Sequence, residues 1–147
     1  RLHGDPIVAR YLSTHGQPWS RAEAEAALAS WIALFETRRL GKLRVRRKAD
    51  NFLVGRAGFG IYGPTGEPEL GYTLFREHWG QGYAVEAATG LRDWLFRETD
   101  APHFIGIAHV DNHASLRVLD KIGMQRTHIG AMDTGLPCQF MILRRPA

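Results

Sequence analysis

Residues 69–84 read ELGYTLFREHWGQGYA, and this stretch decides the fold. Residues 69–75 are mostly aliphatic, aromatic or threonine, which is typical of a strand. Gly80 and Gly82 then form a short glycine-rich turn before apolar residues recur at helical spacing from Ala84 onward. A helix that begins after such a turn has unpaired backbone N–H groups at the positive end of its dipole. The stretch therefore predicts either a plain turn or a site for a phosphate or pyrophosphate.

Upstream of this stretch, the sequence predicts a helix and an antiparallel meander. Ser20 and Glu23 have the spacing of a capping box, and the apolar periodicity that follows predicts a helix over about 21–37. Residues 43–48 and 52–60 are expected to be strands that pair in sequence order with 69–75. A further helical segment is expected between Asp5 and Leu12.

Downstream, a helix from about Ala84 leads to residues 104–108, a short apolar run typical of a buried strand. The next helix is capped by Asn112 and ends before Gly123, and two strands over about 124–129 and 137–144 complete the chain. This order of elements predicts an α/β or α+β fold with a mixed sheet.

Composition limits the class of protein. The chain has 147 residues, 44% of them hydrophobic and 23% charged, which fits one globular domain over 1–147 and excludes a disordered or fibrous protein. No apolar run approaches the roughly 18 residues that cross a bilayer. Cys138 is the single cysteine and cannot form an internal disulfide, so we expect a cytoplasmic protein without a membrane partner.

The net charge is +4, and residues 38–48 contain seven Lys or Arg and no acid. This basic cluster could bind nucleic acid, phosphates or an acidic protein, or it could be a solvated strand edge.

A second informative stretch is 112–124, which reads NHASLRVLDKIGM. Asn112 and Ser115 both lie in the first turn of the predicted helix, where they can cap the backbone or contact a ligand. His109 and His113 have the spacing of metal ligands, but a strand-to-helix junction separates them and no carboxylate cluster completes a site. No metal is expected.

Three motifs occur in order: E-x-G-Y-x-L at 69–74, W-G-x-G-Y-A-x-E-A at 79–87 and N-x-A-S-x-R-V-L-x-K-x-G-M at 112–124. Together they resemble the GNAT superfamily of acyl-CoA-dependent N-acetyltransferases, in particular its branch of ribosomal-protein N-terminal acetyltransferases. The likeness runs from about Asp5 to the C-terminus. Trp79 stands where the superfamily usually has Gln or Arg, and the strand with which the family usually opens is missing.

The resemblance implies a mixed, mainly antiparallel sheet flanked by helices, in which acetyl-CoA lies in a V-shaped split between parallel strands at 69–75 and 104–110. It implies transfer of the acetyl group to a primary amine, which could belong to a protein N-terminus or to a small molecule. Residues implied to hold the cofactor are Tyr72, Thr73 and Leu74 beside its pantetheine arm, the amides of Gly80, Gln81, Gly82, Tyr83 and Ala84 at its pyrophosphate, and Asn112.

The chemistry requires a neutral amine, a stabilised oxyanion and a proton for the departing thiolate. Glu69 is the candidate base, although a solvent-facing strand residue is its alternative role. A bulge at Gly71 and Tyr72 could offer N–H donors to the oxyanion. Many members of the superfamily protonate the thiolate with a tyrosine at the position of Leu119, so Ser115 is the candidate here, with capping as its alternative.

The missing first strand would leave a sheet edge bare, so we expect a longer natural chain or a second copy that forms a homodimer. The basic cluster then favours an acidic protein N-terminus as acceptor, and nucleic acid is not the expected partner. The competing hypothesis is a non-catalytic module that binds acyl-CoA or nucleic acid on the same fold. Steep weakening of binding by salt would indicate nucleic acid.

Overall fold

The computed structural model describes residues 2–11, 17–132 and 135–147. Six strands form one sheet in the order β1-β2-β3-β4-β6-β5. The strands are β1 (Gly41–Arg46), β2 (Leu53–Tyr62), β3 (Glu67–Leu74), β4 (His103–His109), β5 (Gln125–Ala131) and β6 (Pro137–Arg144). The α-helices are α1 (Pro6–Ala9), α2 (Arg21–Arg38), α3 (Tyr83–Glu98) and α4 (His113–Lys121). Short 3-10 segments span Leu2–Gly4 and Arg76–His78.

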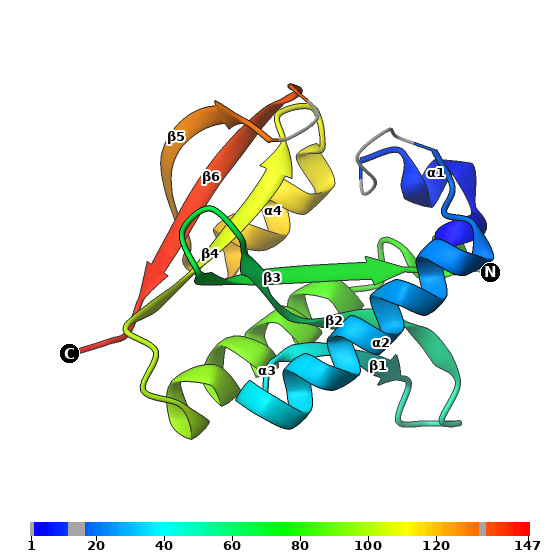
Figure 1. Cartoon of the computed structure of the whole chain (residues 1–147), viewed down its shortest axis with the longest axis horizontal. Coiled ribbons are helices and arrows are strands. Elements are labelled where there is room, and N and C mark those ends of the chain that lie inside the picture. Colours follow the sequence, from blue (N-terminus) through cyan, green and yellow to red (C-terminus); the bar gives the residue numbers. More distant parts are fainter. Residues whose placement is uncertain (1, 12–16, 133–134) are drawn as a thin grey trace.

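The sheet consists of two antiparallel halves. Strands β1, β2 and β3 form the expected meander, and β4, β6 and β5 form the second half. The halves meet where β3 and β4 run parallel, and Figure 1 shows these two strands diverging beyond their contact. The mixed, mainly antiparallel sheet predicted from the sequence is therefore confirmed.

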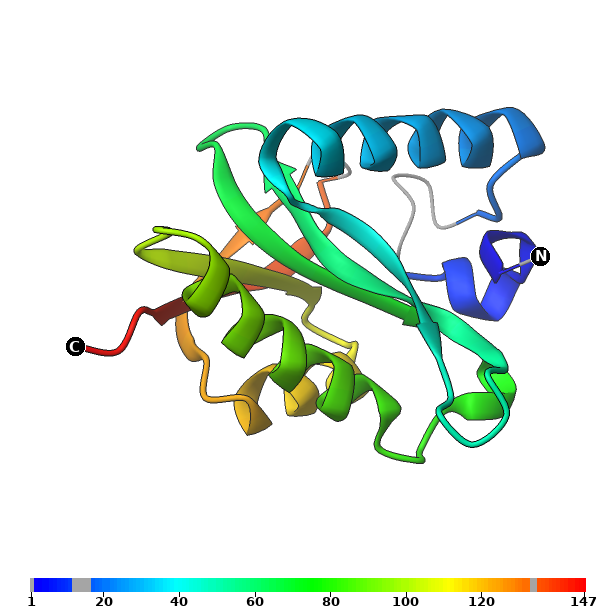
Figure 2. The same cartoon turned by 90° about the horizontal axis from the view of Figure 1, so that it is seen from below.

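Helices cover both faces of the sheet, with α2 on one face and α3 and α4 on the other (Figure 2). The buried core lies on the α3 and α4 face, where Phe59 and Phe104 meet edge to face at 5.3 Å between ring centroids. Side chains alternate along β3, so that Leu70 joins this core. Glu69 consequently points toward the α2 face. This alternation separates the residues that hold the fold together from those available for chemistry.

Local signals account for the helix boundaries. Ser20 and Glu23 form both hydrogen bonds of a capping box, which starts α2 where the sequence predicted it. Helix α1 is shorter than expected: Asp5 caps it by accepting a hydrogen bond from Ile7, but the helix ends at Ala9. Leu12, the predicted end, lies outside the described residues.

Within the described ranges, no helix has the length and apolar character needed to cross a membrane.

Candidate active site

The parallel contact between β3 and β4 is only two residue pairs long, Glu69 with Ile105 and Leu70 with Gly106. Beyond Leu70 the two strands separate, while β3 stays paired with β2 as far as Leu74. Backbone groups on the free side of residues 71–74 thus face the split, where an extended ligand can pair with them as an added strand does.

The bulge expected at Gly71 and Tyr72 is wrong. The register between β2 and β3 is continuous from Glu67 to Leu74 without a shift. Any backbone donor for an oxyanion therefore comes from the divergence of β4, which leaves one edge of β3 free, and not from an irregularity within β3.

The glycine-rich turn lies at the N-terminus of α3, as predicted. Gly80 and Gly82 have positive φ values of 72° and 85°, and Gly82 is the N-cap residue without a side-chain cap. Trp79 donates from Nε1 to the carbonyl of Leu74 at 3.0 Å, and Gln81 donates to the carbonyl of Glu77 at 3.0 Å. Trp79 ties the turn to the end of β3, and Gln81 ties it to the 3-10 segment Arg76–His78. The uncapped backbone N–H groups are therefore what the turn offers to an anion.

A pair of hydroxyls lies between β3 and α4. Tyr72 Oη is 2.8 Å from Ser115 Oγ and also donates to the Ser115 carbonyl at 3.1 Å. Burial raises the pKa of Tyr72 to about 12, against the effect of its hydrogen bond to Ser115, so the phenol keeps its proton at neutral pH. Sequence reasoning assigned only the backbone of Tyr72 and missed its hydroxyl. The alternation along β3, which turns Tyr72 toward the helices, was the available signal.

Asn112 and Leu119 belong to the same capped helix as Ser115. Asn112 Oδ1 accepts a hydrogen bond from the Ser115 amide at 3.3 Å, so Asn112 caps α4 as expected. Leu119 is buried in the core. At the position where many superfamily members have a proton-donating tyrosine, this chain therefore has a side chain that only packs.

Glu69 lies half-buried on the α2 face, and burial raises the pKa of its carboxyl group above the usual range. The positive charge of Lys42 acts in the opposite direction. Because its pKa is raised, this carboxylate is a stronger base than an ordinary one, and it lies next to a free strand edge.

Lys42 is a functional candidate that sequence reasoning missed, because it was counted as part of the basic cluster. Its Nζ donates to the Gly58 carbonyl at 3.0 Å, and a Cβ at Gly71 would lie only 2.5 Å from Nζ. Burial, and then the charge of Arg56, lower the pKa of Lys42 to about 7 against the opposing charge of Glu69. A glycine inside a strand marks such a close approach and was the signal available.

The rest of the basic cluster is not one uniform patch. Arg47 pairs with Asp50 at 2.6 Å, and Arg46 donates to the carbonyl of Asn51. The members that remain exposed without these contacts are Arg38, Arg39, Arg44 and Lys48.

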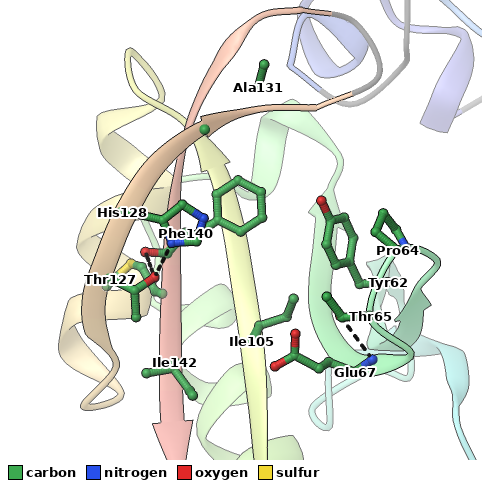
Figure 3. Close-up of a pocket in the computed structure, with 12 residues that line it drawn as sticks. Tyr62, Pro64, Thr65, Glu67, Ile105, Thr127, His128, Ala131, Phe140 and Ile142 are labelled. Atoms are coloured by element: carbon green, nitrogen blue, oxygen red, sulfur yellow. Dashed lines mark hydrogen bonds between the residues drawn. The ribbon is translucent and has the colours of Figure 1, made fainter.

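A cavity of about 440 Å³ lies between the β2–β3 hairpin and strands β4 to β6 (Figure 3). Tyr62 and Phe140 face each other there with ring centroids 5.8 Å apart. Glu67 also lines the cavity, and its Oε2 is 2.6 Å from His103 Nε2. Because Glu67 is two residues before Glu69 on the same face of β3, the cavity adjoins the candidate base. The residues expected at the pyrophosphate are not among those that line it.

Across residues 2–11, 17–132 and 135–147, no three His, Cys, Asp or Glu side chains are grouped so that they could hold a metal. His109 Nδ1 instead accepts a hydrogen bond from the Asp111 amide at 3.0 Å.

The split sheet next to a glycine-rich helix N-terminus agrees with the fold that the resemblance to the GNAT superfamily implies. The model of the acetyltransferase (GNAT) domain matches residues 1–125. The chain belongs to the GNAT acetyltransferase family. An N-acetyltransferase of Bacillus subtilis, YoaA, is 27% identical over 120 residues, which cover 81% of this chain and 67% of YoaA. Matched regions span between 33% and 67% of the length of the curated relatives.

Solved structures of GNAT acetyltransferases share the fold. RimL, a ribosomal L7/L12 alpha-N-protein acetyltransferase in complex with coenzyme A, has a TM-score of 0.79 and 17% identity over 96% of this chain and 82% of its own. Spermidine N-acetyltransferase from Vibrio cholerae, in complex with CoA and spermine, has a TM-score of 0.77 and 14% identity over 98% of this chain and 86% of its own. At these identities the likeness is one of fold alone.

Proposed function

We propose that this GNAT acetyltransferase is an N-acetyltransferase that moves an acetyl group from acetyl-CoA to a primary amine by direct attack, and that residues 1–147 act as one catalytic domain. The observation that carries the proposal is the two-residue contact between β3 and β4, which leaves a free strand edge next to the uncapped N-terminus of α3. A strand edge and a helix N-terminus together suit a ligand with an amide-containing arm and a pyrophosphate.

The proposed acetyl-CoA site combines the geometry of the split with the resemblance to the GNAT superfamily. The backbone of Tyr72, Thr73 and Leu74 pairs with the pantetheine arm. The pyrophosphate contacts the amides of the turn and first helical residues, namely Gly80, Gln81, Gly82, Tyr83 and Ala84. Asn112, at the start of α4, contacts the arm from the opposite side of the split.

The proposed reaction needs a base for the acceptor amine and a proton donor for the departing thiolate. Glu69 takes a proton from the acceptor ammonium group, because only the neutral amine can attack the thioester carbon. A C–N bond then forms and the C–S bond breaks, so that coenzyme A leaves as a thiolate and the new amide nitrogen loses its second proton to water. The hydroxyl pair of Tyr72 and Ser115 supplies the proton or hydrogen bond that the thiolate requires, and Tyr72 is suited to this role because it remains protonated.

We propose the N-terminus of an acidic protein as the acceptor. The exposed members of the basic cluster, which include Arg44 and Lys48, lie on the hairpin that flanks the α2 face and favour negative partners. Among the solved structures that share this fold, RimL acts on a ribosomal protein and the Vibrio cholerae enzyme acts on spermidine. Protein N-termini and small amines therefore both need to be tested as acceptors.

The decisive experiment measures thiol release from acetyl-CoA with a panel of small amines and N-terminal peptides, and locates the acetyl group on the product by mass spectrometry. We expect turnover with at least one primary amine and acetylation on nitrogen. Binding of acetyl-CoA without turnover of any acceptor would instead support the non-catalytic module. Acetylation on oxygen would show that the acceptor class is wrong.

A further inference from the structure

Arg56 on β2 lies half-buried beneath aromatic side chains on the α2 face. Its guanidinium carbon is 4.7 Å from the ring centroid of Trp31, and its Nε donates to His3 Nε2 at 2.9 Å. The His3 ring stacks on Trp19 at 3.9 Å between centroids. Among the described residues, no carboxylate forms an ion pair with Arg56, and burial lowers its pKa to about 10. Partial burial of a guanidinium group without an anion costs free energy, and an anionic ligand would offset that cost.

Two further polar atoms near Arg56 lack hydrogen-bond partners in the part of the chain that the structure describes. Because His3 Nε2 accepts from Arg56, the neutral ring carries its proton on Nδ1, and this atom is buried without a partner. Burial, and then the charge of Arg56, lower the pKa of His3 to about 4, so the ring is neutral at physiological pH. Thr73 lies opposite Arg56 in the β2–β3 register, and its buried hydroxyl also has no partner.

The register places Arg56 at a defined separation from the candidate base. Arg56 pairs with Thr73, and Gly60 pairs with Glu69, four residues earlier on β3. Four residues of extended strand span about 13 Å. The pair Gly58 and Gly71, which carry no side chains, lies between the pair Arg56 and Thr73 and the pair Gly60 and Glu69. The Lys42 side chain lies over this part of the sheet, where its Nζ donates to the Gly58 carbonyl. An extended peptide covers the same distance in roughly three or four residues.

We propose that Arg56 is a specificity residue that binds a carboxylate of the acceptor, carried on an acidic side chain within the first few residues after the acetylated N-terminus. Trp31 and His3 position the guanidinium group for this contact. The inference rests on the proposed N-acetyltransferase function and narrows its acceptor class. The α-carboxylate of a free amino acid lies too close to its amine to reach Arg56 while the amine is at Glu69.

The test uses peptides with N-terminal serine, an amidated C-terminus and a single Asp at position two, three or four, each matched with the Asn peptide. Glycine and glycinamide form the short-spacing pair. For wild type we expect kcat/KM to favour the best Asp peptide over its Asn partner by about 10-fold or more, as for a hydrogen-bonded charge pair. Glycine and glycinamide should not differ in this way.

Arg56→Gln should remove the preference for Asp and change kcat/KM for the Asn peptide by less than about threefold, whereas Arg56→Lys should retain part of the preference. Arg44→Gln is the matched control, because Arg44 pairs with Arg56 across the β1–β2 register but is exposed. Equal losses in the Arg44→Gln and Arg56→Gln variants would indicate a diffuse field of the hairpin and overturn the inference. A loss shared by the Asp and Asn peptides would show that Arg56 is only structural.

Binding is measured as well, by the shift in Tm that each peptide causes with coenzyme A present. The Asp peptide should shift wild type and not Arg56→Gln. If no peptide is turned over, the proposed function fails, yet this shift still decides the role of Arg56. No difference between the Asp and Asn peptides in either assay would overturn the inference.

Discussion

At the scale of single residues, the α2 face of the sheet carries two charged side chains that are partly buried. Burial lowers the pKa of Lys42, and the charge of Glu69 opposes this shift. Burial raises the pKa of Glu69, and the charge of Lys42 opposes that shift. Lys42 Nζ lies close over Gly71, where a Cβ would come within 2.5 Å of it. A proton can therefore be exchanged near neutral pH in a region that water reaches poorly.

Replacing Glu69 by Gln should lower kcat at neutral pH by about 10²-fold or more, because the base is removed while the shape of the side chain is kept. The affinity for acetyl-CoA should change little. The matched control is Glu67→Gln, which alters the neighbouring carboxylate on the same face and should retain most of the rate. Steady-state kinetics and calorimetric binding of acetyl-CoA check both variants. An unchanged rate in Glu69→Gln would assign the proton transfer to water, and a collapse in cofactor affinity would make Glu69 structural.

Lys42→Met should shift the acidic limb of the pH–rate profile to higher pH. The positive charge of Lys42 lowers the pKa of Glu69, so its removal raises that pKa and keeps the base protonated up to a higher pH. Activity should consequently be lost most near and below neutral pH and recover as the pH rises. Rate profiles of wild type and variant between pH 5 and 9 provide the measurement. A shift to lower pH would contradict the assigned coupling.

At the scale of elements, the turn before α3 depends on backbone conformation more than on side chains. Gly80 and Gly82 adopt left-handed conformations that other residues rarely take. The bond from Trp79 to the end of β3 then holds the helix N-terminus beside the split. Only eight residues of chain, 75–82, connect the strand edge to the helix N-terminus.

Gly82→Val should abolish the increase in Tm that acetyl-CoA causes, because a β-branched residue cannot readily adopt φ near 85° and the helix N-terminus must reorganise. Gly66→Val is the control for strain alone, since Gly66 has a φ of 74° and open space around its Cα, but lies in the β2–β3 turn. Both variants should lose stability, and only Gly82→Val should lose the response to acetyl-CoA. A folded Gly82→Val protein with the full response would place the pyrophosphate elsewhere.

Elements whose signals are local could be predicted from the sequence. The capping box at Ser20 started α2 correctly, and the turn at Gly80 and Gly82 was placed at the start of α3. The split between β3 and β4 was expected from a family resemblance and is confirmed. The bulge expected at Gly71 and Tyr72 was wrong, because β3 keeps a regular register with β2 and its free edge arises where β4 diverges.

The side-chain groups of the site could not be predicted for the same reason. Tyr72 and Ser115 are 43 residues apart, and Arg56 meets His3 across 53 residues. Only the packing of the helical segments against the sheet brings such partners together. Lys42 and Arg56 each look like ordinary surface cations in the sequence, since neither has a local partner that marks it as buried. The roles of Glu69 and Ser115 stay predictions until their variants are measured.

At the scale of the whole molecule, two half-sheets share one core. Phe59 belongs to the first half and Phe104 to the second, and their contact below the sheet holds the halves together where the strands diverge. Helix α3 contributes Leu95 to the same core. The split is therefore supported by packing on one face, while the other face remains available for the acceptor.

Acetyl-CoA should stabilise the whole domain because it binds only the folded split. At a concentration 100-fold above Kd, the free energy of unfolding should rise by about 2.7 kcal/mol, which corresponds to roughly 5 to 10 °C in Tm for a domain of this size. Thermal unfolding at increasing acetyl-CoA concentration measures the effect. Added salt should weaken it far less than it weakens binding to a nucleic acid backbone. No shift at saturating acetyl-CoA, or a steep dependence on salt, would count against the proposed site.

The two-residue contact between β3 and β4 also affects how the protein behaves when it has no ligand. An ordinary open sheet has two outer edges, whereas this one has two more in its interior, along residues 71–74 and along the facing part of β4. Unpaired edges are where chains add to one another and aggregate. A ligand that lies along the split occupies those interior edges, so concentrated protein should stay monodisperse for longer when saturated with acetyl-CoA than when it is free.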